Sequence, residues 1–214
     1  SGSIILTAFT NDPAGVCLAG NDQIIINVYQ PPAITVQPSA TQTLCSGTTA
    51  NFSVTATGDG LTFQWKKNGS IISNGGNISG ANTANLTLSN TTAADNATYT
   101  VEVSGVSPCT SVTSDNSVLT VNQVVAITSQ PATTQTFCSG STANFAVAAT
   151  GTGLTYQWKK GGVDVVDGGN ISGATTNALT ILNVSTADAG TFTVVVSGTA
   201  PCTAVTSNNA VLVV

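Results

Sequence analysis

Residues 37–58 read QPSATQTLCSGTTANFSVTATG, and residues 130–151 read QPATTQTFCSGSTANFAVAATG. The second segment begins 93 residues after the first (130 − 37), and the same offset relates Trp65 to Trp158. A repeat of this length corresponds to a whole domain rather than to one unit of a solenoid. The sequence therefore predicts two domains of the same fold in tandem.

Each copy contains short runs in which apolar and polar residues alternate, separated by clusters of Gly, Ser, Thr and Asn. Phe52 and Val54 alternate in one run, and Tyr99, Val101 and Val103 alternate in another. Because successive side chains of a β-strand point to opposite faces, the alternating residues share one inward face. Short strands at this spacing are typical of a sandwich or barrel, so we predict an all-β fold.

The composition narrows the class of function. Charged residues make up 6% of the chain, against roughly 25% in a typical soluble domain. The net charge is −5, with four basic residues, so nucleic acid is not expected as a partner. The sequence lacks histidine and any apolar run of membrane-spanning length, so it predicts no Ser-His-Asp triad, no metal or cofactor site and no membrane insertion.

Residues 1–31 do not belong to the repeat. They predict two antiparallel strands, residues 4–10 and 23–29, around a long turn. Cys17 lies 92 positions before Cys109, which aligns this hairpin with the last two strands of each repeat. A single hairpin is too small to fold alone. We therefore interpret residues 1–31 as the end of a preceding, incomplete sandwich domain, followed by domains at residues 32–122 and 123–214.

Four segments resemble a known family: TFQWKKNG at residues 62–69, TYQWKKGG at 155–162, LTLSNTTAADNATYTV at 86–101 and LTILNVSTADAGTFTV at 179–194. They are similar to immunoglobulin-like domains of the intermediate type, specifically those in arrays on surface and gliding adhesins of Bacteroidota that the type IX pathway secretes. The resemblance implies an immunoglobulin-like sandwich, an extracellular location on the cell surface and a non-catalytic, adhesive or structural role.

The sequence departs from the family pattern at the core cysteine pair. Valines stand at both positions in each repeat, so we expect an apolar core beneath the tryptophans, formed by Val54, Val101 and Trp65 and by Val147, Val194 and Trp158. We also take Asn96 as the counterpart of Gly190 and expect it to adopt a left-handed backbone, which asparagine tolerates.

The five cysteines predict disulfides in an oxidising compartment. One possibility is pairing within repeats, Cys45 with Cys109 and Cys138 with Cys202. In the topology that the resemblance implies, the two cysteines of a repeat lie at opposite ends of a strand, about 25 Å apart. A disulfide needs Cα atoms within about 7 Å. We therefore prefer a link between Cys45 and Cys202 across the domain joint, with the partner of Cys17 outside the chain.

Three functions remain open. The first is a structural or adhesive stalk of a cell-surface adhesin or extracellular filament, in which neighbouring immunoglobulin-like domains of the same or adjacent chains are the partners. The second is a self-assembling filament subunit that donates the strands of residues 1–31. The third is a glycan-binding module of a secreted protein. The weak candidates for binding a surface polysaccharide are Lys66, Lys67, Lys159 and Lys160, although we favour the interpretation of these lysines as solvated strand ends.

Overall fold

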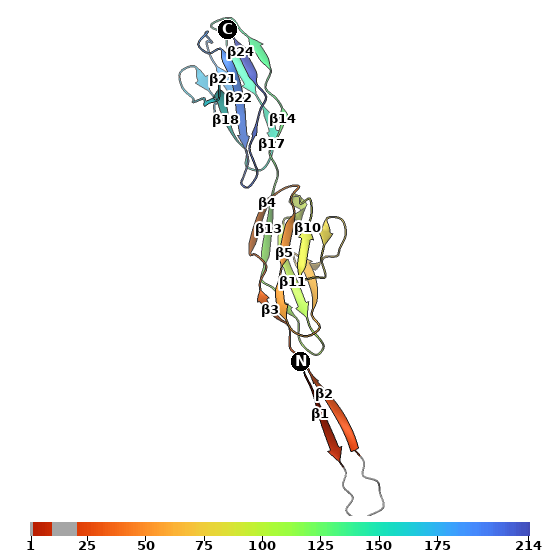
Figure 1. Ribbon diagram of the computed structural model, residues 1–214. Helices are drawn as coiled ribbons and strands as arrows, with labels where there is room; N and C mark the ends of the chain where they lie inside the picture. Colours follow the sequence, from red (N-terminus) through yellow and green to blue (C-terminus); the bar gives the residue numbers. More distant parts are fainter. Residues whose placement is uncertain (1, 10–20) are drawn as a thin grey trace, which may run out of the picture. The chain divides into compact units, whose positions relative to one another are not determined.

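The structure, a computed structural model, describes residues 2–9 and 21–214. Throughout these residues the chain is built of β-strands, and the one helix described is a short 3-10 turn, η1 (Ala93–Asp95). The chain divides into two compact units. The first unit comprises Ser1–Gln42, Thr49–Ser89 and Ala97–Val118, and the second comprises Thr43–Thr48, Asn90–Asn96 and Leu119–Val214. The all-β prediction is confirmed, and each repeat forms its own pair of sheets (Figure 1).

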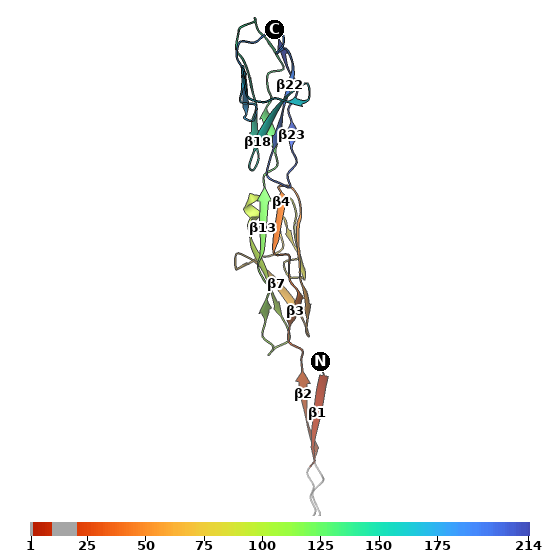
Figure 2. The same cartoon turned by 90° about the vertical axis from the view of Figure 1, so that its left-hand side faces the viewer.

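The first repeat contains two main sheets. One has the strand order β5-β10-β9, and the other has the order β4-β13-β11-β7-β8, with β4 beside β13 in both views (Figures 1 and 2). Three further strands complete the repeat: β12 pairs with β11, and β3 pairs with β6 in a separate two-stranded sheet. The strands of this repeat are β3 (Ala33–Val36), β4 (Thr41–Cys45), β5 (Ala50–Ser53), β6 (Thr55–Thr57), β7 (Thr62–Lys67), β8 (Ser70–Ile71), β9 (Ile78–Ser79), β10 (Asn85–Leu88), β11 (Ala97–Ser104), β12 (Val112–Thr113) and β13 (Ser117–Asn122).

The second repeat has the same topology. Its sheets have the orders β16-β21-β20 and β15-β24-β22-β18-β19, while β23 pairs with β22 and β14 with β17. Strand β15 runs parallel to β24, whereas β22 is antiparallel to both of its neighbours in the sheet. The strands are β14 (Ala126–Ser129), β15 (Thr134–Thr136), β16 (Ala143–Ala146), β17 (Ala148–Thr150), β18 (Thr155–Lys160), β19 (Val163–Asp164), β20 (Ile171–Ser172), β21 (Ala178–Ile181), β22 (Gly190–Ser197), β23 (Val205–Thr206) and β24 (Ala210–Val213).

The core of the first repeat follows from the alternation along its strands. On β11 every second residue is buried, namely Tyr99, Val101 and Val103. The register places Val101 opposite Trp65 of β7. Phe52, from the other sheet, packs on the Tyr99 ring at a centroid distance of 4.8 Å and on the Trp65 ring at 6.0 Å. These contacts join the two sheets through one apolar layer.

The second core repeats this arrangement. Trp158 of β18 lies opposite Val194 of β22, and both are completely buried. Phe145 from the other sheet lies 6.0 Å from Trp158 and 5.1 Å from Phe192, measured between ring centroids. The buried indole is also satisfied as a donor, because its Nε1 donates to the Thr176 carbonyl at 2.9 Å. The two remaining valines expected in the cores, Val54 and Val147, are buried as well.

The backbone at Asn96 differs from the sequence prediction. Asn96 has φ −59° and ψ 115°, so it is not left-handed. The 93-residue offset pairs Gly190, whose φ is +150°, with Ala97 rather than with Asn96. The Asn96 side chain has a different function: its Oδ1 accepts a hydrogen bond from the Val121 backbone N–H at 2.6 Å. It thus satisfies a polar group near the end of β13.

The N-terminal hairpin consists of β1 (Gly2–Phe9) and β2 (Asn21–Val28), paired antiparallel. The register places Ile4 opposite Ile26 and Leu6 opposite Ile24. Paired residues lie on the same face of a ribbon, so these four side chains form one apolar face. All four are more than 40% exposed in the structure. The described hairpin therefore has an apolar face that it does not bury itself.

Candidate functional site

A disulfide joins Cys45 to Cys202, with the two Cα atoms 5.5 Å apart. The two residues come from different repeats and are 157 positions apart in sequence, yet both belong to the second compact unit. Because these cysteines bond to each other, neither of the within-repeat pairs is formed. Cys109 is a half-buried free thiol and Cys138 an exposed one. Cys17 lies outside the described residues.

Hydrogen bonds between the same chain segments surround the disulfide. The Ser46 N–H donates to the Asn122 carbonyl at 2.8 Å, and the Asn122 side-chain amide donates to the Ala200 carbonyl at 3.0 Å. The Ser46 hydroxyl accepts from the Val124 N–H at 3.3 Å. Asn122 is 5% exposed, so its amide is desolvated and needs this partner. Near each cysteine, a polar group thus bonds to residues 122–124: Ser46 beside Cys45, and the Ala200 carbonyl close to Cys202.

The lysines that follow each tryptophan make contacts within their own repeats. Lys66 forms an ion pair with Glu102 at 2.7 Å, and Lys159 forms one with Asp164. The Lys66 ammonium, together with the Ser111 hydroxyl, lowers the pKa of the Glu102 carboxyl. Lys160 donates to the Ala187 carbonyl at 2.7 Å and lies over the Phe192 ring. Lys67 also has an interaction partner.

These contacts weaken the prediction of basic spots for an acidic polysaccharide. A phosphate, sulfate or carboxylate ligand would have to compete with the carboxylates already paired to Lys66 and Lys159. The ion pairs are solvent-accessible, so each contributes little to the stability of the fold. The arrangement fits polar strand ends better than a preformed anion site.

The aspartate before the long strand of each sheet closes a tight turn. The Asp95 carboxylate accepts the Thr92 N–H at 2.8 Å, and the Asp188 carboxylate accepts the Ser185 N–H at 2.8 Å. Partial burial by itself would raise the pKa of Asp188. Hydrogen bonds from Ser185 and Asn170, with the Lys160 charge, outweigh this effect and lower the pKa. Both aspartates are therefore structural.

We expect Asp188→Asn to destabilise the second repeat by about 1–2 kcal/mol at pH 7, because the neutral amide accepts the Ser185 N–H less strongly. The pKa of Asp188 is lowered on folding, so its contribution is present above the ordinary aspartate pKa near 4 and disappears as the pH falls through the folded pKa. Denaturant unfolding of both proteins from pH 7 to pH 2 measures this. A difference that stays constant to pH 2 would contradict the assignment.

The described residues contain no cluster of three or more His, Cys, Asp or Glu side chains that could hold a metal ion. Six large aromatic side chains lie in the cores and are almost completely buried, namely Phe52, Trp65, Tyr99, Phe145, Trp158 and Phe192, whereas Phe9 and Tyr29 near the N-terminus are exposed. Among the helices of the described segments, none has the length and apolar character to cross a membrane.

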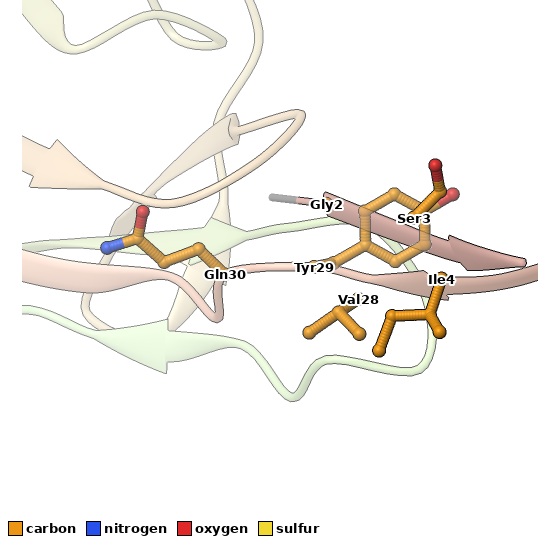
Figure 3. A pocket seen from close by; sticks show the side chains of 6 residues that line it. All are labelled: Gly2, Ser3, Ile4, Val28, Tyr29 and Gln30. Carbon is orange, nitrogen blue, oxygen red and sulfur yellow. The ribbon is translucent and has the colours of Figure 1, made fainter.

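A surface hollow lies at the open end of the hairpin. Gly2, Ser3 and Ile4 of β1 line it together with Val28, Tyr29 and Gln30 (Figure 3). Its lining is mostly apolar, and the Ile4 and Val28 side chains lie next to each other on one side of the ribbon. The hollow is shallow and open, so it extends the exposed apolar face of the hairpin and has no convergent polar groups.

Comparison with protein families identifies both repeats. Residues 31–105 match the immunoglobulin domain family, and residues 125–209 match the immunoglobulin I-set domain family. Comparison with curated proteins gives no match.

Solved structures with the same fold contain several immunoglobulin domains each. An I-band fragment from titin is 20% identical with a TM-score of 0.63, and the match covers 85% of this chain and 65% of the fragment. Domains 1–4 of Sidekick-1 are 18% identical with a TM-score of 0.68, covering 90% of this chain and 54% of that one. The eight N-terminal domains of Down Syndrome Cell Adhesion Molecule are 17% identical with a TM-score of 0.71, covering 97% and 27%.

This chain therefore spans less than two thirds of each of these three structures, and at such identities the likeness shows the fold. The predicted immunoglobulin-like sandwich is confirmed for both repeats by the family matches and by the strand topology. The chain is a tandem immunoglobulin-domain protein.

Proposed function

We propose that this chain is a non-catalytic part of the stalk of a secreted cell-surface adhesin or extracellular filament. In this proposal residues 32–122 and 123–214 are spacer domains that hold a binding region away from the cell, and residues 1–31 complete a further domain. Secretion by the type IX pathway of a Bacteroidota organism is part of the proposal. It rests on the resemblance of the tryptophan and aspartate motifs of both repeats to that group.

The observation that carries the proposal is the bond between Cys45 and Cys202. A spacer holds its tip at a defined position only if its domains keep a fixed relation to one another. A covalent bond between the repeats, in addition to the peptide connection near Asn122, removes most of the freedom of two domains joined by a single linker. Enzymes and small-ligand binders have no general need of such a bond.

Two further observations support a structural role. The interior of each repeat is filled with aromatic and aliphatic side chains around Trp65 and Trp158. Convergence of titratable groups on a cavity is the usual sign of catalysis. In the part of the chain that the structure describes, titratable groups do not converge in this way. The residues that carry charge, such as Lys66 and Asp188, hold the local fold together.

NMR relaxation of the full chain tests this function. We expect the amides of both repeats to report the same rotational correlation time in the oxidised protein, because the disulfide makes the repeats tumble together. In the Cys45→Ala/Cys202→Ala variant the two repeats should tumble with separate and shorter times. The matched control is Cys109→Ala/Cys138→Ala, which removes two cysteines and leaves the disulfide. Independent tumbling of the repeats in the oxidised wild type would exclude a stiff spacer.

The exposed apolar face of the hairpin, with Ile4 opposite Ile26, favours strand donation as a second candidate. A two-stranded ribbon with open edges and one apolar face can complete the sandwich of a neighbouring chain. In the same relaxation experiment, a correlation time that rises steeply with protein concentration would favour this candidate. A time that is independent of concentration would count against it.

A further inference from the structure

The two free thiols occupy positions equivalent to those of the two bonded cysteines. Cys138 follows Cys45 by 93 residues, and Cys109 precedes Cys202 by the same number. Cys45 and Cys202 form the disulfide, while Cys109 and Cys138 are free. Each repeat thus contains one cysteine equivalent to Cys45 and one equivalent to Cys202. One cysteine of each type lacks a partner in the described chain.

The backbone around Cys138 has the geometry of the bonded cysteine. At Cys45 the chain turns so that the Thr48 N–H donates to the Cys45 carbonyl at 3.2 Å. At Cys138 the Ser141 N–H donates to the Cys138 carbonyl at the same distance. The glycine inside each turn has nearly the same positive φ, 84° at Gly47 and 86° at Gly140. The second turn therefore has the same backbone form as the turn that holds a bonded cysteine.

The other type of cysteine is also duplicated. Cys202 lies at the end of a tight loop in which its N–H donates to the Thr199 carbonyl at 3.2 Å, and the Cys109 N–H donates to the Val106 carbonyl at 3.0 Å. A proline precedes the cysteine in both loops. The loop of Cys109 therefore presents its thiol in the same backbone setting as the bonded Cys202.

The polar groups beside the disulfide are repeated as well. Ser46, which bonds to the segment between the repeats, has its counterpart in Ser139 beside Cys138. The Ala200 carbonyl, which accepts the Asn122 amide, has its counterpart in the carbonyl of Ser107. Cys138 is exposed, so a partner can reach it.

We propose that Cys138 is a disulfide-forming site whose partner is the cysteine of a proline-cysteine loop, like that of Cys202, on a further immunoglobulin-like domain. Cys109 is the complementary site, and its partner is a cysteine in a Cys-Ser-Gly turn. This inference rests on the proposed stalk function. It implies that a disulfide like Cys45–Cys202 recurs between successive domains of the stalk. In forming the bond, two thiols release two protons and two electrons, and a small-molecule disulfide takes them up as it is reduced to two thiols.

The test appends a third domain to the complete chain. A copy of residues 122–214 is fused after Val214, so that Asn122 of the copy follows Val214 as Asn122 follows Val121 in the original. The protein is oxidised with glutathione disulfide and mapped by mass spectrometry without reduction. We expect Cys138 to be linked to the appended copy of Cys202 and to lose its reactivity toward an alkylating agent, while Cys45 stays linked to the original Cys202.

The matched control carries Cys138→Ser in the same fusion, and the appended copy of Cys202 should then stay alkylatable. Two outcomes would overturn the inference: a Cys138 thiol that remains free, and a Cys138 that is blocked only by glutathione. Either outcome with the Cys45–Cys202 bond intact would leave the proposed stalk function standing, because the relaxation experiment above tests that function on the original chain.

Discussion

Replacing Trp158 with alanine is expected to lower the free energy of unfolding of the second repeat by about 3–5 kcal/mol, the range observed when large aromatic side chains are removed from protein cores. Trp158 is completely buried, packs against Phe145 and lies opposite Val194. The substitution leaves a cavity between the two sheets and removes the N–H group that donates a hydrogen bond to the Thr176 carbonyl. Denaturant unfolding followed by circular dichroism measures the loss.

Two controls separate packing from other effects. Trp158→Phe keeps an aromatic ring but loses the Nε1 donor, so it should cost less than the alanine variant. Val163→Ala changes a side chain of the same repeat that is 72% exposed, and it should alter stability by no more than about 0.5 kcal/mol. A Trp158→Ala protein within about 1 kcal/mol of the wild type would show that the indole does not hold the sheets together.

Removing the disulfide is expected to have a similarly large effect. A Cys45→Ala/Cys202→Ala variant should lose about 3–5 kcal/mol of unfolding free energy, because the unfolded chain is no longer closed into a loop by a bond between residues 157 positions apart. Guanidinium unfolding of the oxidised wild type and of the variant measures the difference. The effect should appear in the transition of the second compact unit, which contains both cysteines.

Reduction of the wild type provides an internal check, since the reduced protein should unfold at the denaturant concentration of the variant. The Cys109→Ala/Cys138→Ala protein keeps the disulfide and should respond to reduction as the wild type does. If reduction shifts the wild-type transition by less than about 0.5 kcal/mol, the disulfide does not stabilise the fold.

The fold class could be predicted from the sequence because the apolar residues of each repeat recur with the period of a strand. The alternation of Tyr99, Val101 and Val103 marks a strand with one buried face, and the structure places it in the middle of a sheet. The 93-residue offset indicated that the chain contains two domains of the same fold. Local pattern and global fold agree here, as they do in most natural sequences.

Details that depend on three-dimensional neighbours could not be predicted in this way. The partner of Lys66 is Glu102, 36 positions away, and only the register of β7 against β11 brings them together. The general tolerance of asparagine for left-handed backbone suggested a positive φ at Asn96. The observed φ is negative, and in this conformation the Asn96 side chain accepts a hydrogen bond from the Val121 N–H. The cysteine positions left two pairings open, because spacing alone does not determine which thiols meet.

The parallel pairing of β15 with β24 determines how the second repeat responds to tension. When the Cys45–Cys202 bond is reduced, tension on the chain ends reaches the repeat through β14 and β15 and leaves it at the end of β24, so the opposed forces act along the parallel strands. Hydrogen bonds such as those from the Phe137 N–H to the Val213 carbonyl and from the Val211 N–H to the Thr133 carbonyl then lie across the load. In the reduced protein these bonds are sheared together instead of breaking one at a time, whereas in the oxidised protein the disulfide carries the load past residues 46–201.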